Sequence, residues 1–186
     1  MPTTITRVNG NMFDLPVDLI TVWLHRGFAR IDLTWNAFLE KHHVRMFPSG
    51  NRVEAGSTCV PWLSRDALMS VEDRRESHLR WVYALNTQQD GLGYRSLSDV
   101  SDAVRRVLDT AHLLQLTTVG FMYIKYAPEG KQPTKALQNL AAATMVASIQ
   151  GWGERNADVD MRVKLVDIDG GFIELGSLVA DYQERS

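Results

Sequence analysis

The chain has almost no cysteine and no long apolar stretch, and these two absences exclude several classes of protein. Cys59 is the only cysteine among 186 residues, so no disulfide framework and no cysteine metal site is available within one chain. No apolar run approaches the roughly 20 residues that span a bilayer, and no charged segment followed by an apolar one opens the sequence. We therefore expect a cytoplasmic protein without a membrane partner.

Charge of either sign is not in excess. The chain has 20 basic and 22 acidic residues and a formal net charge of −2, which gives no overall signature of nonspecific nucleic-acid binding. Hydrophobic residues make up 45% and charged residues 23% of the chain, as in ordinary globular proteins. Length and composition together predict a single domain over residues 1–186.

Several sequence motifs of catalysis and cofactor binding are also missing. There is no Gly-x-Ser-x-Gly elbow, no Walker loop and no complete dinucleotide fingerprint, since Gly91-Leu92-Gly93 lacks the third glycine. His42 and His43 are adjacent, so their side chains diverge on a helix, and no His-x-x-x-His pattern accompanies them. The sequence therefore predicts neither a metal site nor a cofactor.

The most informative stretch combines a strand, a loop and a helix. Thr117 to Ile124 is a continuous apolar run rich in β-branched and aromatic residues, typical of a strand buried on both faces. The segment Lys125 to Pro133 cannot continue that strand, and Thr134 then opens a helix that we expect to end at Gly151 and Gly153. In α/β sheets, a loop between a strand and a helix is where anionic ligands bind.

The remaining pattern alternates strands and helices. Ser96 is expected to cap a helix, because Asp99 follows three residues later and an apolar stripe runs to Leu114. Residues 46–56 are turn-rich and residues 64–77 form a charged surface segment. Further strands are expected at Ile5–Val8, Leu19–Leu24, Thr58–Leu63, Arg80–Leu85 and Met161–Ile168, and further helices at Thr34–His42 and Ser177–Glu184. This order predicts a three-layer α/β domain with a mixed sheet.

Short matches along the chain add a family resemblance. After the first strand, Asn9-Gly10-Asn11-Met12-Phe13 resembles the opening Gly-Asp-Ile or Gly-Asp-Leu-Phe pattern of macrodomains, and residues 17–20 (Val-Asp-Leu-Ile) resemble the family's following strand. Residues 118–130 resemble the strand that leads into the family's phosphate loop, and residues 161–167 resemble its late strand. The resemblance implies a macrodomain-like fold with ADP-ribose or a related nucleotide as ligand.

Within this family, the chain is most similar to the subgroup that removes ADP-ribose from glutamate or from DNA bases. There a strand like Trp81 to Leu85 runs into a motif that ends in Thr-Lys, whereas this chain has Thr87-Gln88. Gln88 stands where the subgroup has its catalytic lysine, and an amide carries no charge and forms no Schiff base. The resemblance therefore implies nucleotide binding without the usual hydrolase activity.

The expected phosphate loop departs from the family pattern. It reads Lys125-Tyr126-Ala127-Pro128-Glu129-Gly130, and only Gly130 keeps the glycine type. Proline lacks an N–H group, and Ala127 and Pro128 both limit how closely a pyrophosphate approaches the backbone. Lys125, Lys131 and Lys135 surround the loop and offer charge in place of lost amides.

Two other segments complete the expected ligand site. Asn11 stands where the family has an aspartate that accepts the adenine amino group, and the asparagine oxygen also accepts that bond. His25 and Arg26 directly follow a strand, at the edge where ligands contact α/β sheets. The candidate ligand-binding residues are Gly10, Asn11, Met12, His25, Arg26, Lys125, Tyr126, Ala127, Glu129, Gly130 and Lys131.

Two alternative functions stay open from the sequence. The lost glycines and the five tryptophans favour a protein-interaction module that has kept the fold and lost the nucleotide. The other alternative is an ADP-ribosyl hydrolase that uses Glu129 and His25 in place of the usual pair, with Glu129 as the one candidate catalytic residue. In each case we expect no metal.

Overall fold

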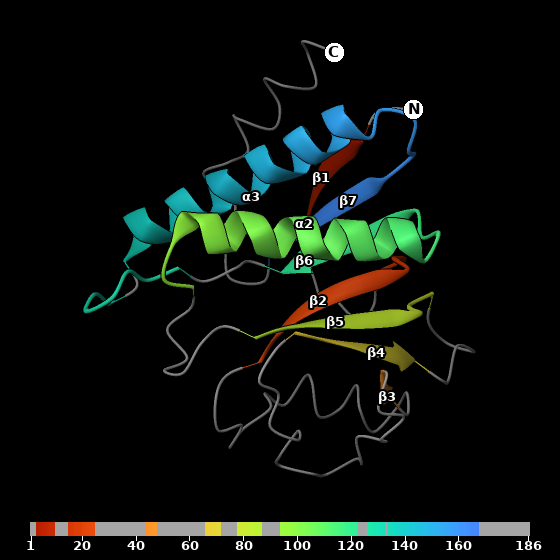
Figure 1. Ribbon diagram of the computed structural model, residues 1–186, viewed down its shortest axis with the longest axis horizontal. Helices are drawn as coiled ribbons and strands as arrows, with labels where there is room; N and C mark the ends of the chain where they lie inside the picture. The colour runs from red at the N-terminus through yellow and green to blue at the C-terminus, as the bar shows by residue number, and fades with distance from the viewer. Residues whose placement is uncertain are drawn as a thin grey trace.

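The computed structural model describes residues 3–9, 15–24, 44–47, 66–71, 78–86, 94–122, 126–132 and 134–167. Along the described parts of the chain, the strands β1 to β5 come first, and helices and strands then alternate (Figure 1). The strands are β1 Thr4–Asn9, β2 Leu19–Leu24, β3 Val44–Phe47, β4 Ala67–Val71, β5 Trp81–Asn86, β6 Thr118–Met122 and β7 Arg162–Asp167. The helices are α2 Leu97–Leu113 and α3 Lys135–Arg155.

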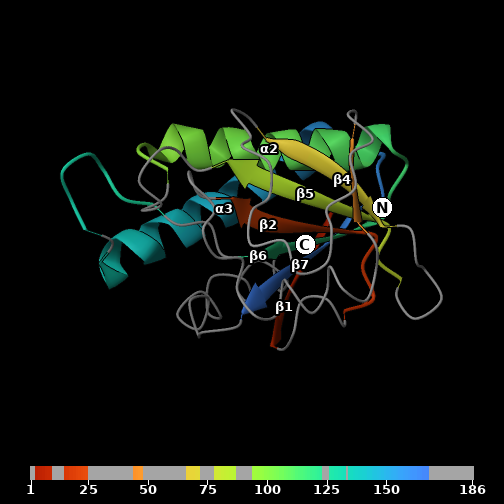
Figure 2. The ribbon, with the colours of Figure 1, turned by 90° about the horizontal axis from the view of Figure 1, so that it is seen from below.

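The strands form one seven-stranded sheet in the order β1-β7-β6-β2-β5-β4-β3, of which the run from β1 to β4 can be followed across the sheet in Figure 2. The pairs β1/β7, β7/β6, β6/β2 and β2/β5 are parallel, whereas β4 is antiparallel to both β5 and β3. The predicted mixed sheet is therefore confirmed. Its parallel part requires crossover connections, and α2 and α3 supply two of them, between β5 and β6 and between β6 and β7.

Both helices lie on the same face of the sheet. Both crossovers move across the sheet in the same direction, and right-handed connections then place both helices on one side. Figure 1 shows α2 and α3 side by side, and the Ser148 hydroxyl donates a hydrogen bond to Ser101 Oγ at 2.9 Å between them. Their buried residues recur at helical spacing: Val100, Ala103, Val104, Val107, Leu108 and Ala111 in α2, and Ala141, Ala142, Met145, Val146, Ile149 and Trp152 in α3.

The centre of the sheet is buried on both faces. Val119 and Phe121 belong to the core cluster that includes the helices, while their neighbour Gly120 faces the other way. A Cβ atom at Gly120 would lie 3.2 Å from Cγ2 of Ile20, itself fully buried. The continuous apolar composition of β6 is explained by this burial on both sides, as the sequence predicts.

Two sequence predictions on the antiparallel side of the sheet are wrong. Residues 64–77 were expected to be a surface segment, but they contain β4, in which Met69 and Val71 are fully buried. The turn-rich segment expected from Met46 overlaps the end of β3, where Met46 pairs with Met69. Cross-strand pairing decides both segments, and local composition does not reveal it.

The predicted end of the second helix is also wrong. Gly151 and Gly153 were expected to terminate it, but α3 continues to Arg155. A Cβ atom at position 153 would lie 2.6 Å from the Thr3 Cβ. Gly153 therefore allows the start of the chain to pass close to the helix, and its function is packing rather than termination.

Other predicted elements lie outside the described residues. These are the strand at 58–63 and the helices at 34–42 and 177–184. Within the described ranges, neither helix is long and apolar enough to cross a bilayer. The α/β fold class itself is confirmed by the mixed sheet and its crossover helices.

Candidate functional site

One edge of the sheet gathers the ends of the parallel strands. β1, β7, β6, β2 and β5 run in the same direction, so their carboxyl ends all lie there. The helices α2 and α3 return from this edge, which places their amino ends beside it. Ligands of open α/β sheets bind at this edge because helix dipoles and free backbone N–H groups point toward it.

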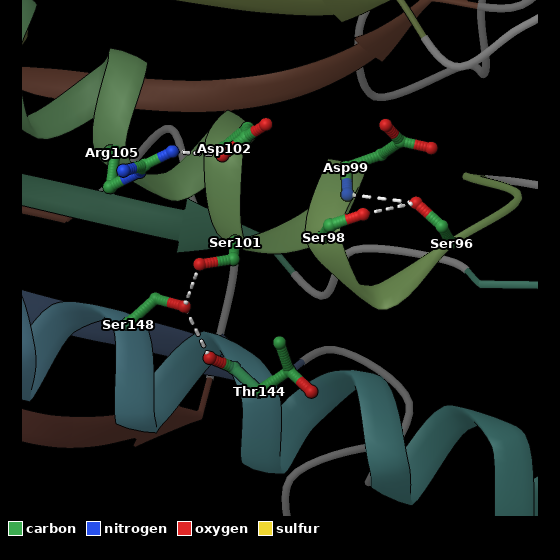
Figure 3. Close-up of polar contacts among 8 residues, drawn as sticks. All are labelled: Ser96, Ser98, Asp99, Ser101, Asp102, Arg105, Thr144 and Ser148. Carbon is green, nitrogen blue, oxygen red and sulfur yellow. Dashed lines mark hydrogen bonds and ion pairs between the residues drawn. The ribbon is translucent and has the colours of Figure 1, made fainter.

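The amino ends of both helices are capped by hydroxyl side chains. Ser96 Oγ accepts a hydrogen bond from the Asp99 amide at 3.1 Å and lies 2.8 Å from Ser98 Oγ (Figure 3). Thr134 Oγ1 accepts from the Leu137 amide at 3.3 Å. Both caps were predicted from the sequence, and they fix where each helix begins.

The loop after β6 is docked onto the segment before α2. Tyr94 and Tyr126 form an isolated parallel bridge, and the Ala127 amide donates to the Tyr94 carbonyl at 2.9 Å. The Arg95 guanidinium donates through Nη1 to the Ala127 carbonyl at 3.1 Å and to the Pro128 carbonyl at 3.5 Å. Gln138 of α3 holds the loop from the other side, with Nε2 3.3 Å from the Tyr126 carbonyl.

Beyond these contacts the loop makes a tight turn. The Lys131 amide donates to the Pro128 carbonyl at 3.0 Å, and Gly130 has a φ of 73°. Glu129 has a negative φ, so the turn has the pattern of type II, in which glycine is favoured at the third position. Glu129 and Gly130 are exposed, and their amides donate to no group in the described ranges. The turn therefore presents two adjacent backbone donors to solvent.

Five of the predicted ligand-binding residues are brought together in this loop. Tyr126 and Ala127 are buried, with Ala127 fully covered, whereas Glu129, Gly130 and Lys131 are exposed. The Ala127 amide is occupied by the Tyr94 carbonyl and the Lys131 amide by the Pro128 carbonyl, which leaves Glu129 and Gly130 as the exposed turn residues with unoccupied amides. The other predicted residues, namely Gly10, Asn11, Met12, His25, Arg26 and Lys125, lie outside the described residues, as does Gln88.

The described strands lead directly to those remaining candidates. β1 ends at Asn9, one residue before Gly10, and β2 ends at Leu24, one residue before His25. Both strands end at the same edge as β6. The chain positions of these candidates are thus consistent with one site, and their side chains stay a prediction.

Sequence reasoning missed two residues that hold the loop. Arg95 and Gln138 both donate hydrogen bonds to its backbone carbonyls. Arg95 directly precedes the helix cap at Ser96. Once the order of strands in the sheet is known, a long cationic side chain at this position indicates a contact with the neighbouring loop after β6. Without the pairing of Tyr94 with Tyr126, nothing in the sequence connects Arg95 to the loop.

A polar cluster lies near this edge. The Arg106 guanidinium forms an ion pair with the Asp66 carboxylate at 2.9 Å, and the Tyr83 hydroxyl lies 3.5 Å from the same oxygen. Burial raises the pKa of Tyr83, and the nearby Asp66 charge adds to the effect. Burial also raises the pKa of Tyr94, strongly, and the Tyr94 hydroxyl has no hydrogen-bond partner within the described ranges.

The described part of the site suits an anion better than a metal. No group of three His, Cys, Asp or Glu side chains in the described ranges is placed to hold a metal ion. The turn instead offers two amides, and the exposed Lys131 adds a positive charge beside them. Backbone amides together with a lysine are the usual donors to phosphate groups.

Comparison with known proteins finds similarity of structure only. No family model matches the chain, and no curated protein matches its sequence. Solved structures do match it over most of its length. The macrodomain of Oceanobacillus iheyensis with ADP has a TM-score of 0.57 at 13% identity, and the match covers 99% of this chain and 93% of that one.

Two further structures give the same architecture. The Trypanosoma brucei macrodomain in complex with ADP-ribose has a TM-score of 0.63 at 14% identity, with 95% of this chain and 69% of that chain covered. The macrodomain of Thermus aquaticus DarG has a TM-score of 0.54 at 12% identity, with 89% and 99% covered. At these identities the likeness establishes the fold.

Proposed function

Because this chain has the macrodomain fold, we propose that it binds ADP-ribose or a related nucleotide at the carboxyl edge of its sheet. The proposal takes residues 1–186 as one domain with one nucleotide site. It assigns the pyrophosphate to the turn Pro128–Lys131 and the nucleoside to Gly10–Met12, with His25 and Arg26 as further contacts.

The observation that carries the proposal is the pair of free amides in that turn. The Glu129 and Gly130 amides are exposed and donate to no group in the described ranges, at the edge that receives ligands in this kind of sheet. Two structural neighbours were solved with ADP or ADP-ribose bound. A pyrophosphate supplies acceptor oxygens for these two amides, and the Lys131 ammonium supports them as a nearby point charge.

The same proposal leaves out hydrolysis. Gln88 stands in the place of the lysine that the resembled hydrolases use, and Glu129 is an exposed turn residue. A carboxylate without its lysine partner has no group to stabilise an opened ribose. Binding without turnover is therefore the expected behaviour toward ADP-ribosylated targets.

Isothermal titration calorimetry with ADP-ribose, ADP, AMP and NAD tests the proposal. We expect micromolar affinity for ADP-ribose, about −8 kcal/mol. Gly130→Glu places a carboxylate at the phosphate position on a residue whose φ of 73° already favours glycine, and we expect it to abolish binding. Gln115→Glu is the matched control, since it adds the same charge at an exposed residue preceding β6, at the opposite edge.

A second candidate function is an interaction module without a nucleotide. It is favoured by the reduced number of donors, since the Ala127 amide is occupied by Tyr94 and Pro128 has none. If no heat is measured with any of the four nucleotides at about a millimolar, corresponding to −4 kcal/mol, nucleotide binding is wrong and this candidate replaces it.

A further inference from the structure

Arg95 lies directly before the cap of α2, outside the loop after β6, and its guanidinium contacts the backbone of that loop. Its Nη1 donates to two consecutive carbonyls, those of Ala127 and Pro128, at 3.1 and 3.5 Å. The adjacent Tyr94 carbonyl accepts from the Ala127 amide at 2.9 Å. Residues 94 and 95 therefore hold the loop through one main-chain bond and one charged side chain.

These contacts fix the orientation of a single peptide plane. The Pro128 carbonyl accepts from Arg95 and from the Lys131 amide, which closes the turn. In a trans peptide the carbonyl and the following N–H group point in opposite directions. The Glu129 amide is consequently directed away from Arg95 and from the body of the protein, toward the exposed side of the turn.

An arginine suits this task better than another residue. It has several donors in a planar arrangement, has no acceptor atom, and stays charged at any ordinary pH. The loop has only one glycine, and its proline ring already fixes one backbone angle. Because Arg95 holds the Ala127 and Pro128 carbonyls, the turn keeps its shape without a bound ligand. The loop then loses less conformational entropy when a ligand binds.

We propose that Arg95 is a positioning residue for the nucleotide site: it orients the turn Pro128–Lys131 through its carbonyls and does not touch the ligand. This inference rests on the proposed function, since the turn is taken to receive the phosphates. It adds a residue that the sequence did not single out, and it explains how a loop with one glycine keeps the Glu129 amide directed toward its exposed side.

The test compares Arg95→Met and Arg95→Lys with Arg105→Met. Arg105 is an exposed arginine of α2 that pairs with Asp102 (Figure 3) and provides the control for loss of charge. In the free protein, hydrogen exchange of the Lys131 amide reports the turn directly. We expect Arg95→Met to speed that exchange about tenfold and to shift the Glu129 and Gly130 amide resonances, with Arg105→Met at the wild-type values.

Affinity for ADP-ribose is measured on the same variants. We expect Arg95→Met to weaken it about tenfold through loss of preorganisation, and Arg95→Lys to restore part of both effects, because an ammonium still reaches one carbonyl. Lost affinity with unchanged Lys131 exchange would overturn the inference, since Arg95 would then act on the ligand itself. Unchanged exchange and unchanged affinity would overturn it as well.

The two proposals fail in different ways. If wild-type protein does not bind ADP-ribose, the proposed function is wrong, while exchange of the Lys131 amide still decides whether Arg95 orients the turn. If Arg95→Met does not fold, the decision rests on Arg95→Lys, which keeps the charge and the alkyl stem but loses the planar donors. Wild-type exchange rates in that variant would then overturn the role of the guanidinium.

Discussion

The two edges of the sheet use their polar groups differently. At the amino edge, the Asp18 carboxylate accepts hydrogen bonds from the Thr117 and Thr118 amides at 3.2 and 3.0 Å and from the Thr118 hydroxyl at 2.6 Å. The Asp18 carbonyl also accepts from the Arg80 and Trp81 amides. One residue thus joins β2, β5 and β6.

At the carboxyl edge the bonds hold the loop and leave its tip unpaired. Arg95 and Tyr94 contact the first part of the loop, whereas the Glu129 and Gly130 amides face solvent. Donors satisfied inside the protein contribute to stability, and donors left exposed are available to a ligand. The comparison therefore separates residues that hold the sheet together from residues that the proposed function assigns to binding.

The largest expected effect on stability comes from Asp18→Ala. The change removes an acceptor of several hydrogen bonds from a partly buried site and leaves the Thr117 and Thr118 amides without it. We expect the free energy of unfolding in urea to fall by about 3 kcal/mol. Affinity for ADP-ribose per folded molecule should stay the same, since the opposite edge is untouched.

Asp158→Ala is the matched control, because Asp158 is an exposed aspartate in the described turn after α3. We expect it to change the free energy of unfolding by no more than about 0.5 kcal/mol. A loss of nucleotide affinity in folded Asp18→Ala protein would break the separation between the two edges.

A smaller effect is expected from alanine at Gly130. Its φ of 73° costs an alanine roughly 1–2 kcal/mol, although no atom would contact the added Cβ within 4 Å. The same substitution at Gly151, within α3, should stabilise the protein by up to about 1 kcal/mol, since alanine favours helix. Both variants are compared by urea unfolding. If glycine-to-alanine lowers the free energy of unfolding at position 130 and raises it at position 151, the loss at position 130 is due to its backbone conformation.

Much of the fold could be predicted because the spacing of apolar residues along the sequence indicates which side chains are buried. The apolar stripe of α2 and the continuous run of β6 show which of their residues are buried, and the caps at Ser96 and Thr134 specify where the helices begin. The strand β4 could not be found in this way. Its buried residues Met69 and Val71 lie within a charged segment, and only pairing with β3 and β5 makes it a strand.

The candidate site was predicted in outline only. The position of the loop follows from the end of β6, and a turn at Gly130 follows from the glycine itself, which has a positive φ. The occupied amide of Ala127 and the contacts of Arg95 depend on Tyr94 lying beside Tyr126, which is more than 30 positions away in the chain. Sequence patterns describe neighbours within an element, whereas these contacts arise from the order of strands in the sheet.

The smallest expected change in stability comes from the Tyr94 hydroxyl. The Tyr94 hydroxyl is buried and has no hydrogen-bond partner within the described ranges. Burying a hydroxyl without a partner is unfavourable, so we expect Tyr94→Phe to raise the free energy of unfolding by roughly 0.5–1 kcal/mol. Tyr83→Phe is the comparison variant, because the Tyr83 hydroxyl lies near the Asp66 carboxylate, and it should give no such gain.

The pH dependence of the same variant gives an independent check. Burial raises the pKa of Tyr94 in the folded protein, so the unfolded chain loses that proton first, near pH 10. The contribution to the free energy of unfolding that comes from this difference in Tyr94 pKa is therefore fully present below about pH 10. It declines as the pH rises toward the pKa of Tyr94 in the folded protein. Urea unfolding at pH 7 and above pH 10 should show a shallower decline for Tyr94→Phe than for wild type. If Tyr94→Phe is instead less stable than wild type at pH 7, the Tyr94 hydroxyl has a hydrogen-bond partner, such as an ordered water. The polar groups of the carboxyl edge would then be paired at this position, as those of the amino edge are paired by Asp18.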